Sequence, residues 1–214
     1  MIPVLGFATY SQFELANRLL DSIDYPVENL VIVDNSGLKT WEPKKPEQVK
    51  NLWFIQVPFG LGLVGAWNLI IKSTPYAPYW VLVNDDAWFE SGALEIIARE
   101  VDPEAMNFVD IIPEWSCVVF GEGAIAKAGL YDERFYPLYF DDNDLQRRME
   151  NSGVKLNKIR AGVNHQNSSS LEGKREQNNR TYNANQKLMD KKVIENDFSA
   201  GYWDLQIRRA NRWD

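Results

Sequence analysis

The sequence has one cysteine, no long apolar segment and no excess of basic residues. Cys117 cannot form a disulfide within the chain, so a reducing compartment is permitted. The longest nearly apolar run, residues 61–71, is interrupted by Asn68 and falls short of the roughly 20 residues that span a bilayer. Residues 1–10 lack the basic start of a signal peptide. These absences predict a cytoplasmic protein without a membrane span.

The charge is acidic overall but unevenly divided along the chain. The net charge is −7; residues 1–150 carry 11 Lys+Arg against 23 Asp+Glu, a balance of −12, and residues 151–214 carry 12 against 7, a balance of +5. Nonspecific binding to nucleic acid needs a basic surface, so we expect no nucleic-acid partner. The basic C-terminal part has two interpretations: it faces a diphosphate or an anionic acceptor, or it is a solvated helical surface.

The composition and the apolar pattern indicate an α/β protein. Hydrophobic residues make up 45% of the 214 residues, which is ordinary for a soluble globular protein and enough for one large domain. Short apolar runs alternate with helical patterns over residues 1–120, as they do when helices cover a parallel sheet. We expect a single Rossmann-like domain, residues 1–170, with a mainly parallel central sheet flanked by helices. Residues 171–214 are predicted to form a C-terminal helical appendage.

The individual runs define seven strands and five helices. The predicted strands are residues 2–8, 30–33, 52–57, 79–83, 108–112, 117–120 and 154–159. The predicted helices are residues 12–23, 65–73, 92–101, 123–128 and 141–152. Ser11 and Ser91 stand where they can cap the first and the third of these helices.

An acidic cluster follows the strand predicted for residues 79–83. It consists of Asn84, Asp85 and Asp86. Carboxylates at the carboxyl end of a strand face the crevice where open α/β sheets bind ligands, and there they can hold a divalent cation against phosphate oxygens. The only histidine, His165, lies in a segment that we interpret as a polar loop. Together with the acidic residues 141–144, the cluster and His165 indicate chemistry on a nucleotide-linked substrate.

A second acidic cluster, residues 141–144, opens the last predicted helix. At about 100° per residue, Asp142 shares a helix face with Leu145 and Met149, which should point to the core. One carboxylate is enough to cap a helix and meet its dipole, and Asp141 can do that. We therefore expect Asp142 to point into the crevice.

The remaining carboxylate of this cluster has a simpler interpretation. Asp144 and Arg148 are one helical turn apart, so their side chains can form an ion pair along the helix. We expect that pair to lie at the surface and to take no part in a site.

A glycine-rich segment supports an alternative function. Residues 60–65, Gly-Leu-Gly-Leu-Val-Gly, match the dinucleotide-binding pattern G-x-G-x-x-G, and Asp85 stands twenty residues after the last glycine. However, the preceding strand is the third of the chain rather than the first, and Pro58 and Phe59 separate it from the glycines. An NAD(P)-binding oxidoreductase that uses Gly60 to Gly65 is the alternative prediction.

Six short segments occur in an order that is typical of one enzyme family. They are residues 9–10, 31–36, 62–68, 83–86, 131–135 and 139–145. With these segments the chain resembles glycosyltransferase family 2, the inverting enzymes of the GT-A fold, in the rhamnosyltransferase-like branch. The resemblance covers residues 2–170. It implies a metal-dependent hexosyltransferase that moves a sugar from a UDP- or dTDP-linked donor to a hydroxyl of a glycan, lipid-linked or protein acceptor.

The resemblance assigns catalytic and metal-binding roles to four residues. Asp141 and Asp142 match the family's acidic pair, whose second member is the general base for the acceptor hydroxyl. Asp86 matches the final carboxylate of the D-x-D motif and would bind Mn²⁺ or Mg²⁺ together with the diphosphate. His165 matches a histidine that completes this site, which suits Mn²⁺ better than Mg²⁺. A structural or merely exposed histidine is the alternative.

The resemblance also implies a set of donor-binding residues. Asp34 matches an aspartate that accepts from the N–H edge of a pyrimidine base, and Asp85 would contact ribose or the donor sugar. Turn formation is the alternative for Asp34, and a helix-flanking polar role is the alternative for Thr9. Asn84 stands where most members have aspartate. The full set is Thr9, Asp34, Gly62, Gly65, Asn68, Asn84 and Asp85.

Other properties are less constrained by the sequence. Acceptor specificity is expected in residues 107–115 and in the tail from Leu171. A non-catalytic module that binds a sugar nucleotide is compatible with the same fold, and so is a homo-oligomer.

Overall fold

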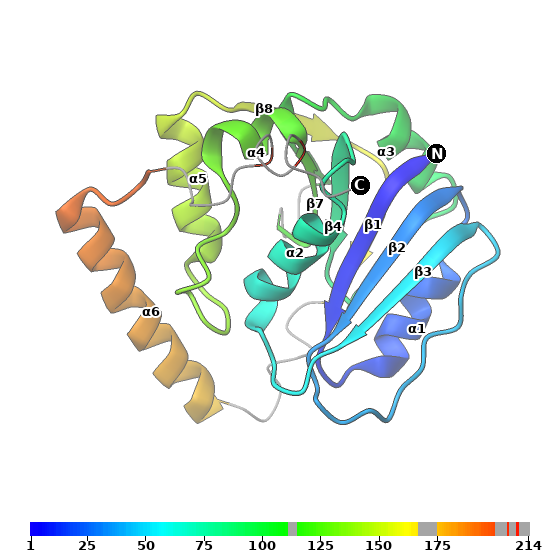
Figure 1. The fold of residues 1–214 in the computed structure, drawn as a ribbon, viewed down its shortest axis with the longest axis horizontal. Helices are drawn as coiled ribbons and strands as arrows, with labels where there is room; N and C mark the ends of the chain where they lie inside the picture. The colour runs from blue at the N-terminus through cyan, green and yellow to red at the C-terminus, as the bar shows by residue number, and fades with distance from the viewer. Residues whose placement is uncertain (111–114, 167–174, 200–204, 206–208, 210–214) are drawn as a thin grey trace.

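The computed structural model describes residues 1–110, 115–166, 175–199, 205 and 209 and has a seven-stranded sheet at its centre (Figure 1). The strand order is β3-β2-β1-β4-β7-β6-β8. The strands are β1 (Ile2–Thr9), β2 (Val27–Asp34), β3 (Val49–Gln56), β4 (Tyr79–Val83), β6 (Ala105–Val109), β7 (Cys117–Gly121) and β8 (Lys155–Ile159). All pairs are parallel except those that β7 makes with β4 and β6. The expected mainly parallel α/β fold is confirmed.

Helices cover both faces of the sheet. Successive strand residues point to opposite faces, and apolar residues on each face are buried under helices. In β1, Leu5 and Phe7 join the core under α1 (Phe13–Asp21) and α3 (Ala93–Glu100). Val4 and Ala8 join the other core, which packs under α2 (Gly62–Ser73), α4 (Glu122–Ala128) and α5 (Asp141–Asn151). The sixth helix, α6 (Arg175–Glu195), lies outside this layer. No helix in the described ranges is long and apolar enough to cross a bilayer.

A second, two-stranded sheet was not expected. Strand β5 (Ala87–Phe89) pairs antiparallel with β9 (Val163–His165), and Ala87 lies opposite His165. The interpretation of His165 as part of a polar loop is therefore wrong. Three residues are too few to show a strand period, and the two partners are far apart in sequence.

Several predicted boundaries differ from the structure. The helices α1 and α3 begin after Gln12 and Gly92, without a side-chain cap, so the expected caps Ser11 and Ser91 are wrong. The strand expected at residues 108–112 is β6, which ends at Val109. Residues 111 and 112 lie outside the described part of the chain.

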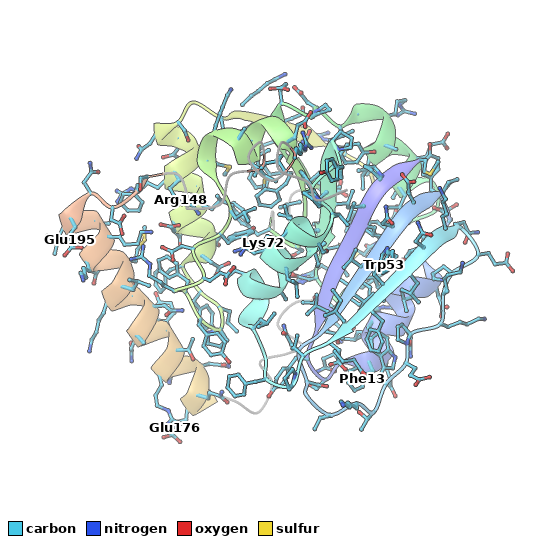
Figure 2. The ribbon with its side chains drawn as sticks, viewed as in Figure 1. Phe13, Trp53, Lys72, Arg148, Glu176 and Glu195 are labelled. Carbon is cyan, nitrogen blue, oxygen red and sulfur yellow. The ribbon has the colours of Figure 1, made fainter. Side chains whose placement is uncertain are left out.

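Buried ion pairs connect α6 to α5 and to the segment before α5. Lys192 Nζ lies 2.7 Å from Asp144 Oδ1 and 2.6 Å from Asp132 Oδ2. Asp144 Oδ2 also accepts from Arg148 Nε at 2.9 Å, and the exposed fractions of these two side chains are 0% and 3%. Arg148 is labelled on α5 in Figure 2. The expected surface pair of Asp144 and Arg148 is therefore wrong. The interpretation of the basic C-terminal part as a solvated surface is also wrong for Lys192, because the side chain of this residue is 4% exposed.

Candidate active site

A cavity of about 980 Å³ lies at the carboxyl ends of β1 and β4. Its wall combines the end of β1, the residues after β4, the loops that precede α2 and α5, and α6. The strand order changes direction here, because β2 and β3 lie on one side of β1 and β4 lies on the other. Open α/β sheets leave a crevice for ligands at such a place. The cavity therefore lies where the sequence predicts a ligand.

The residues after β4 form one wall of the cavity. Asp86 Oδ1 lies 2.8 Å from His165 Nε2, and Asn84 Nδ2 lies 3.4 Å from the same nitrogen. The small sheet brings His165 here, because the pairing of β5 with β9 is continued by a bond from the Gln166 N–H to the Asp86 carbonyl. Two residues 79 positions apart in the sequence thus meet as a carboxylate and an imidazole.

Asp85 is a buried carboxylate of the same wall. Burial raises the pKa of its carboxyl to about 7, and the negative charge of Asp86 adds to the rise. The Thr9 hydroxyl and His165 act in the opposite direction. Thr9 and Asp85 are 2% and 7% exposed. Near neutral pH the carboxyl of Asp85 is therefore partly protonated and partly ionised.

The second acidic cluster lies on the same cavity, at the start of α5. Asp141 and Asp142 both line it. The residue that caps α5 is Phe140, without a side-chain bond, so the expected capping by Asp141 is wrong. Asp142 is half-buried and its Oδ1 accepts from the Asn143 N–H at 2.8 Å. The expectation that Asp142 faces the crevice agrees with its place in the cavity wall.

Asp141 is less accessible than Asp142. It is 9% exposed, and burial raises the pKa of its carboxyl to about 7, with a further rise from the charge of Asp142. Backbone N–H groups of Asp141 and Tyr139 bond to this carboxyl and limit the rise. A pKa near neutrality at a cavity wall is typical of residues that exchange protons.

The loop before α5 is held in a strained conformation. Tyr139 and Phe140 have φ angles of 81° and 67°, in the left-handed region that residues other than glycine seldom adopt. Each such residue costs about 1–3 kcal/mol and persists only where its surroundings hold it. The acidic pair therefore follows directly on a segment whose conformation depends on its neighbours.

Replacing Asp141 with Asn should raise the free energy of unfolding at about pH 8 by roughly 1–4 kcal/mol, since one unit of pKa shift corresponds to about 1.4 kcal/mol. Folding raises the pKa of this carboxyl from 3.8 to about 7, so the folded state holds the proton more tightly than the unfolded chain. Wild-type stability is therefore lost as the pH rises through this window and is retained below it. Urea unfolding at about pH 4.5 and about pH 8 measures the effect.

The matched control for this prediction is Glu150→Gln, on the exposed face of α5. It should change stability by less than about 0.5 kcal/mol at both pH values. If Asp141→Asn does not raise the free energy of unfolding at the higher pH, or raises it equally at both pH values, the buried charge of Asp141 does not destabilise the folded protein.

The predicted donor-binding residues divide into two groups. Thr9, Gly62, Asn84 and Asp85 line the cavity. Within the described chain, Asp34, Gly65 and Asn68 lie outside its wall.

Two residues of the second group have evident structural contacts. Asp34 Oδ1 accepts from the Ser36 N–H at 2.9 Å, as the turn-forming alternative expects. Asn68 Nδ2 donates to the Tyr131 carbonyl at 3.0 Å and to Glu133 Oε1 at 2.9 Å, which ties α2 to the segment before α5. A contact of Asp34 or Asn68 with a nucleotide stays a prediction.

The glycine-rich segment has a position unlike that of a dinucleotide fingerprint. It follows β3, which is an edge strand, whereas the fingerprint follows the strand at the crevice. Gly62 has a φ of +74°, and a Cβ atom there would lie 2.9 Å from the Pro137 carbonyl oxygen. The glycine thus permits close approach of the loop before α5. This accounts for Gly62 without a dinucleotide.

The sequence offered the basic C-terminal part as a neighbour of a diphosphate or an anionic acceptor, but it did not identify the residues of α6 that line the cavity. Arg180, Thr181 and Tyr182 line the wall opposite the strand ends, and Arg180 is the only Lys or Arg among the described lining residues. The positive balance of the C-terminal part was the one available signal. It did not identify which basic residue faces the cavity.

The residues present fit a divalent cation that also binds a ligand. The described residues contain no group of three or more His, Cys, Asp or Glu side chains that could hold a metal ion by themselves. The 2.8 Å between Asp86 Oδ1 and His165 Nε2 is close to the spacing, about 3 Å, of adjacent ligands on an octahedral cation with bonds of about 2.1 Å. The pair can supply two ligands, and phosphate oxygens and water would supply the others.

The sheet order, the covering helices and the crevice at β1 and β4 match those of solved structures with the GT-A fold. No protein-family model and no curated protein matches the chain. Similar solved structures include S. aureus TarS 1-349 in complex with UDP, with 13% identity and a TM-score of 0.58 over 76% of this chain and 58% of that chain. The mannosyltransferase PcManGT from Pyrobaculum calidifontis, in complex with GDP-Man and Mn²⁺, has 16% identity and a TM-score of 0.52 over 76% and 57%.

A third similar structure is GalNAc-T7 with UDP, GalNAc and Mn²⁺, at 9% identity and a TM-score of 0.55 over 77% of this chain and 44% of that chain. The chain therefore spans less than two thirds of the length of each of these structures. At these identities the likeness concerns the fold.

Proposed function

We propose that the protein is an inverting, metal-dependent glycosyltransferase of the rhamnosyltransferase-like branch of family 2, using a UDP- or dTDP-linked sugar. The observation that carries the proposal is the convergence of Asp86 and His165 with Asp141 and Asp142 on one cavity. Proteins of similar fold are solved in complex with UDP, UDP-GlcNAc or GDP-Man, the last with Mn²⁺. A donor diphosphate at the strand ends would leave the acceptor on the side of α5 and α6.

In the proposed reaction Asp142 removes the proton from an acceptor hydroxyl. The acceptor oxygen attacks the anomeric carbon on the face opposite the diphosphate and forms the new bond. The bond from that carbon to the diphosphate oxygen breaks, and its electron pair leaves with the nucleoside diphosphate. A single displacement of this kind inverts the anomeric centre. Asp142 suits the base role better than Asp141 because it is more accessible from the cavity.

The remaining residues of the wall would bind the donor and the acceptor. Asp86 and His165 would hold Mn²⁺ or Mg²⁺, and the cation would neutralise the charge that grows on the leaving diphosphate. Arg180 would face the diphosphate or an anionic acceptor, and the Tyr139 ring would stack on a sugar face. The acceptor is a glycan, a lipid-linked saccharide or a protein. A cytoplasmic location and a homo-oligomer stay predictions.

Asp86→Asn should weaken the binding of UDP in the presence of Mn²⁺ at least about tenfold, because the amide removes the charge that holds the cation. Isothermal calorimetry with UDP and with dTDP, each with and without Mn²⁺, measures this. The wild-type protein should bind one of the two nucleotides more tightly when Mn²⁺ is present.

The control is Asp21→Asn, an exposed carboxylate at the end of α1, which should leave the affinity unchanged. Wild-type binding that is absent, or indifferent to Mn²⁺, would count against the proposed function. Metal-dependent binding without hydrolysis or transfer of any nucleotide sugar would instead favour the non-catalytic module.

A further inference from the structure

The strained residues before the acidic pair are held by α6. Asn185 is 4% exposed, and its Nδ2 donates to the Leu138 carbonyl at 2.8 Å. The carbonyls of Tyr136 and Tyr139 lie 3.3 Å and 3.4 Å from the same nitrogen. One buried amide nitrogen thus donates to three carbonyl oxygens of the loop that leads into α5. Without a donor among them, these buried oxygens would lack hydrogen bonds, which is unfavourable.

Aromatic contacts from α6 support the same loop. The ring centroid of Tyr182 lies 4.9 Å from that of Phe140 and 5.7 Å from that of Tyr139. Tyr182 and Asn185 are three residues apart and therefore neighbours on the helix surface. Both residues with left-handed backbone thus contact the Tyr182 ring, and the Tyr139 carbonyl also accepts from the Asn185 amide.

The helix that carries these two side chains is itself fixed against α5. Lys192 stands two turns after Asn185, on the same helix face, and forms the buried ion pairs with Asp144 and Asp132. Since Asp144 belongs to the first turn of α5, the same helix holds both ends of the connection around Asp141 and Asp142.

We propose that Asn185 is a positioning residue for the transfer reaction. It acts through the loop of residues 136–140 to set the orientation of Asp142 toward the cavity. Helix α6 is then a part of the catalytic apparatus that fixes the base, rather than an appendage that leaves the chemistry unchanged. This inference rests on the proposed function, since Asp142 needs a precise orientation only if it serves as the base.

Asn185→Asp tests the proposal, because the carboxylate has the shape of the amide but donates no hydrogen bond to a carbonyl. The turnover of UDP-GlcNAc or dTDP-rhamnose, whichever the wild-type protein hydrolyses, should fall about 10–100-fold, since a misplacement of about 1 Å costs a factor of this size. The affinity for UDP with Mn²⁺ should stay unchanged, because the cation site lies on the opposite wall. Asn183→Asp, an exposed change on the same helix, is the matched control and should behave as wild type.

Hydrogen exchange of the backbone amides at residues 139–143 provides a measurement that does not depend on activity. Exchange there should be faster in Asn185→Asp than in Asn183→Asp, below the unfolding temperature of both. Unchanged exchange, or a turnover equal to wild type, overturns the role of Asn185. A third outcome is faster exchange in Asn185→Asp together with a wild-type protein that neither binds nor hydrolyses a nucleotide sugar. In that case Asn185 holds the loop of residues 136–140, but its role in transfer is overturned because the proposed function has failed.

Discussion

Asp142→Asn is expected to lower the turnover of the nucleotide-sugar donor by about 10²–10⁴-fold, the usual contribution of a general base. The amide keeps the size of the side chain and its bond from the Asn143 N–H, but it cannot take up a proton. Binding of UDP with Mn²⁺ should persist, because the cation would be held by Asp86 and His165. Steady-state hydrolysis of the donor and calorimetry on the same sample measure the two quantities.

The informative comparison is Asp141→Asn. Asp141 shares the cavity but is less accessible, so its replacement should lower turnover less than that of Asp142. If Asp141→Asn has the greater effect, the base is the buried carboxyl with the raised pKa, and the two roles are exchanged. Normal turnover in both variants would remove the acidic pair from the mechanism.

Lys192→Met is expected to lower the free energy of unfolding by about 3–5 kcal/mol, the cost of leaving a buried ion partner unpaired. The methionine retains much of the apolar stem of the side chain, so the loss reports on the charge. Burial raises the pKa of Asp132, yet Arg134 and Lys192 together hold it well below its usual range. Removal of Lys192 leaves Asp132 and Asp144 with less compensation in a buried place.

Urea unfolding near neutral pH measures this loss, and Lys191→Met is the control. Lys191 is the neighbouring residue, and its side chain is 67% exposed. Its Nζ lies 3.8 Å from Oε1 of Glu195. An exposed pair of this kind contributes at most about 1 kcal/mol. Equal effects of the two substitutions would mean that α6 is not fixed by the buried pairs.

Much of the fold could be predicted because local patterns carry it. The strand predicted at residues 79–83 coincides with β4, an unbroken apolar run of five buried residues. The acidic residues after it could be placed in the crevice from one rule about open sheets. The short partners β5 and β9 could not, because a strand of three residues has no periodic signal and its stability comes from pairing.

The burial of Asp144 and Arg148 also could not be predicted from local sequence patterns. The spacing of Asp144 and Arg148 predicts their ion pair, which the structure contains, but it does not predict that the pair is covered. Burial depends on Lys192, which the fold brings from 44 residues further along the chain than Arg148. The strain at Tyr139 and Phe140 has no sequence signal either, since neither residue is a glycine.

The sequence by itself determined the alternation of strands and helices, the delivery of Asp85 and Asp86 to the tip of a strand, and the place of Asp141 and Asp142 at the start of a helix. These follow from periodicity and from the direction of neighbouring side chains, which are local properties. Only the tertiary structure decided that the pairing of β5 with β9 brings His165 to Asp86, and that α6 completes the cavity wall and holds the loop before α5. The physical reason is that hydrogen bonds and ion pairs between distant segments depend on which surfaces the fold brings together.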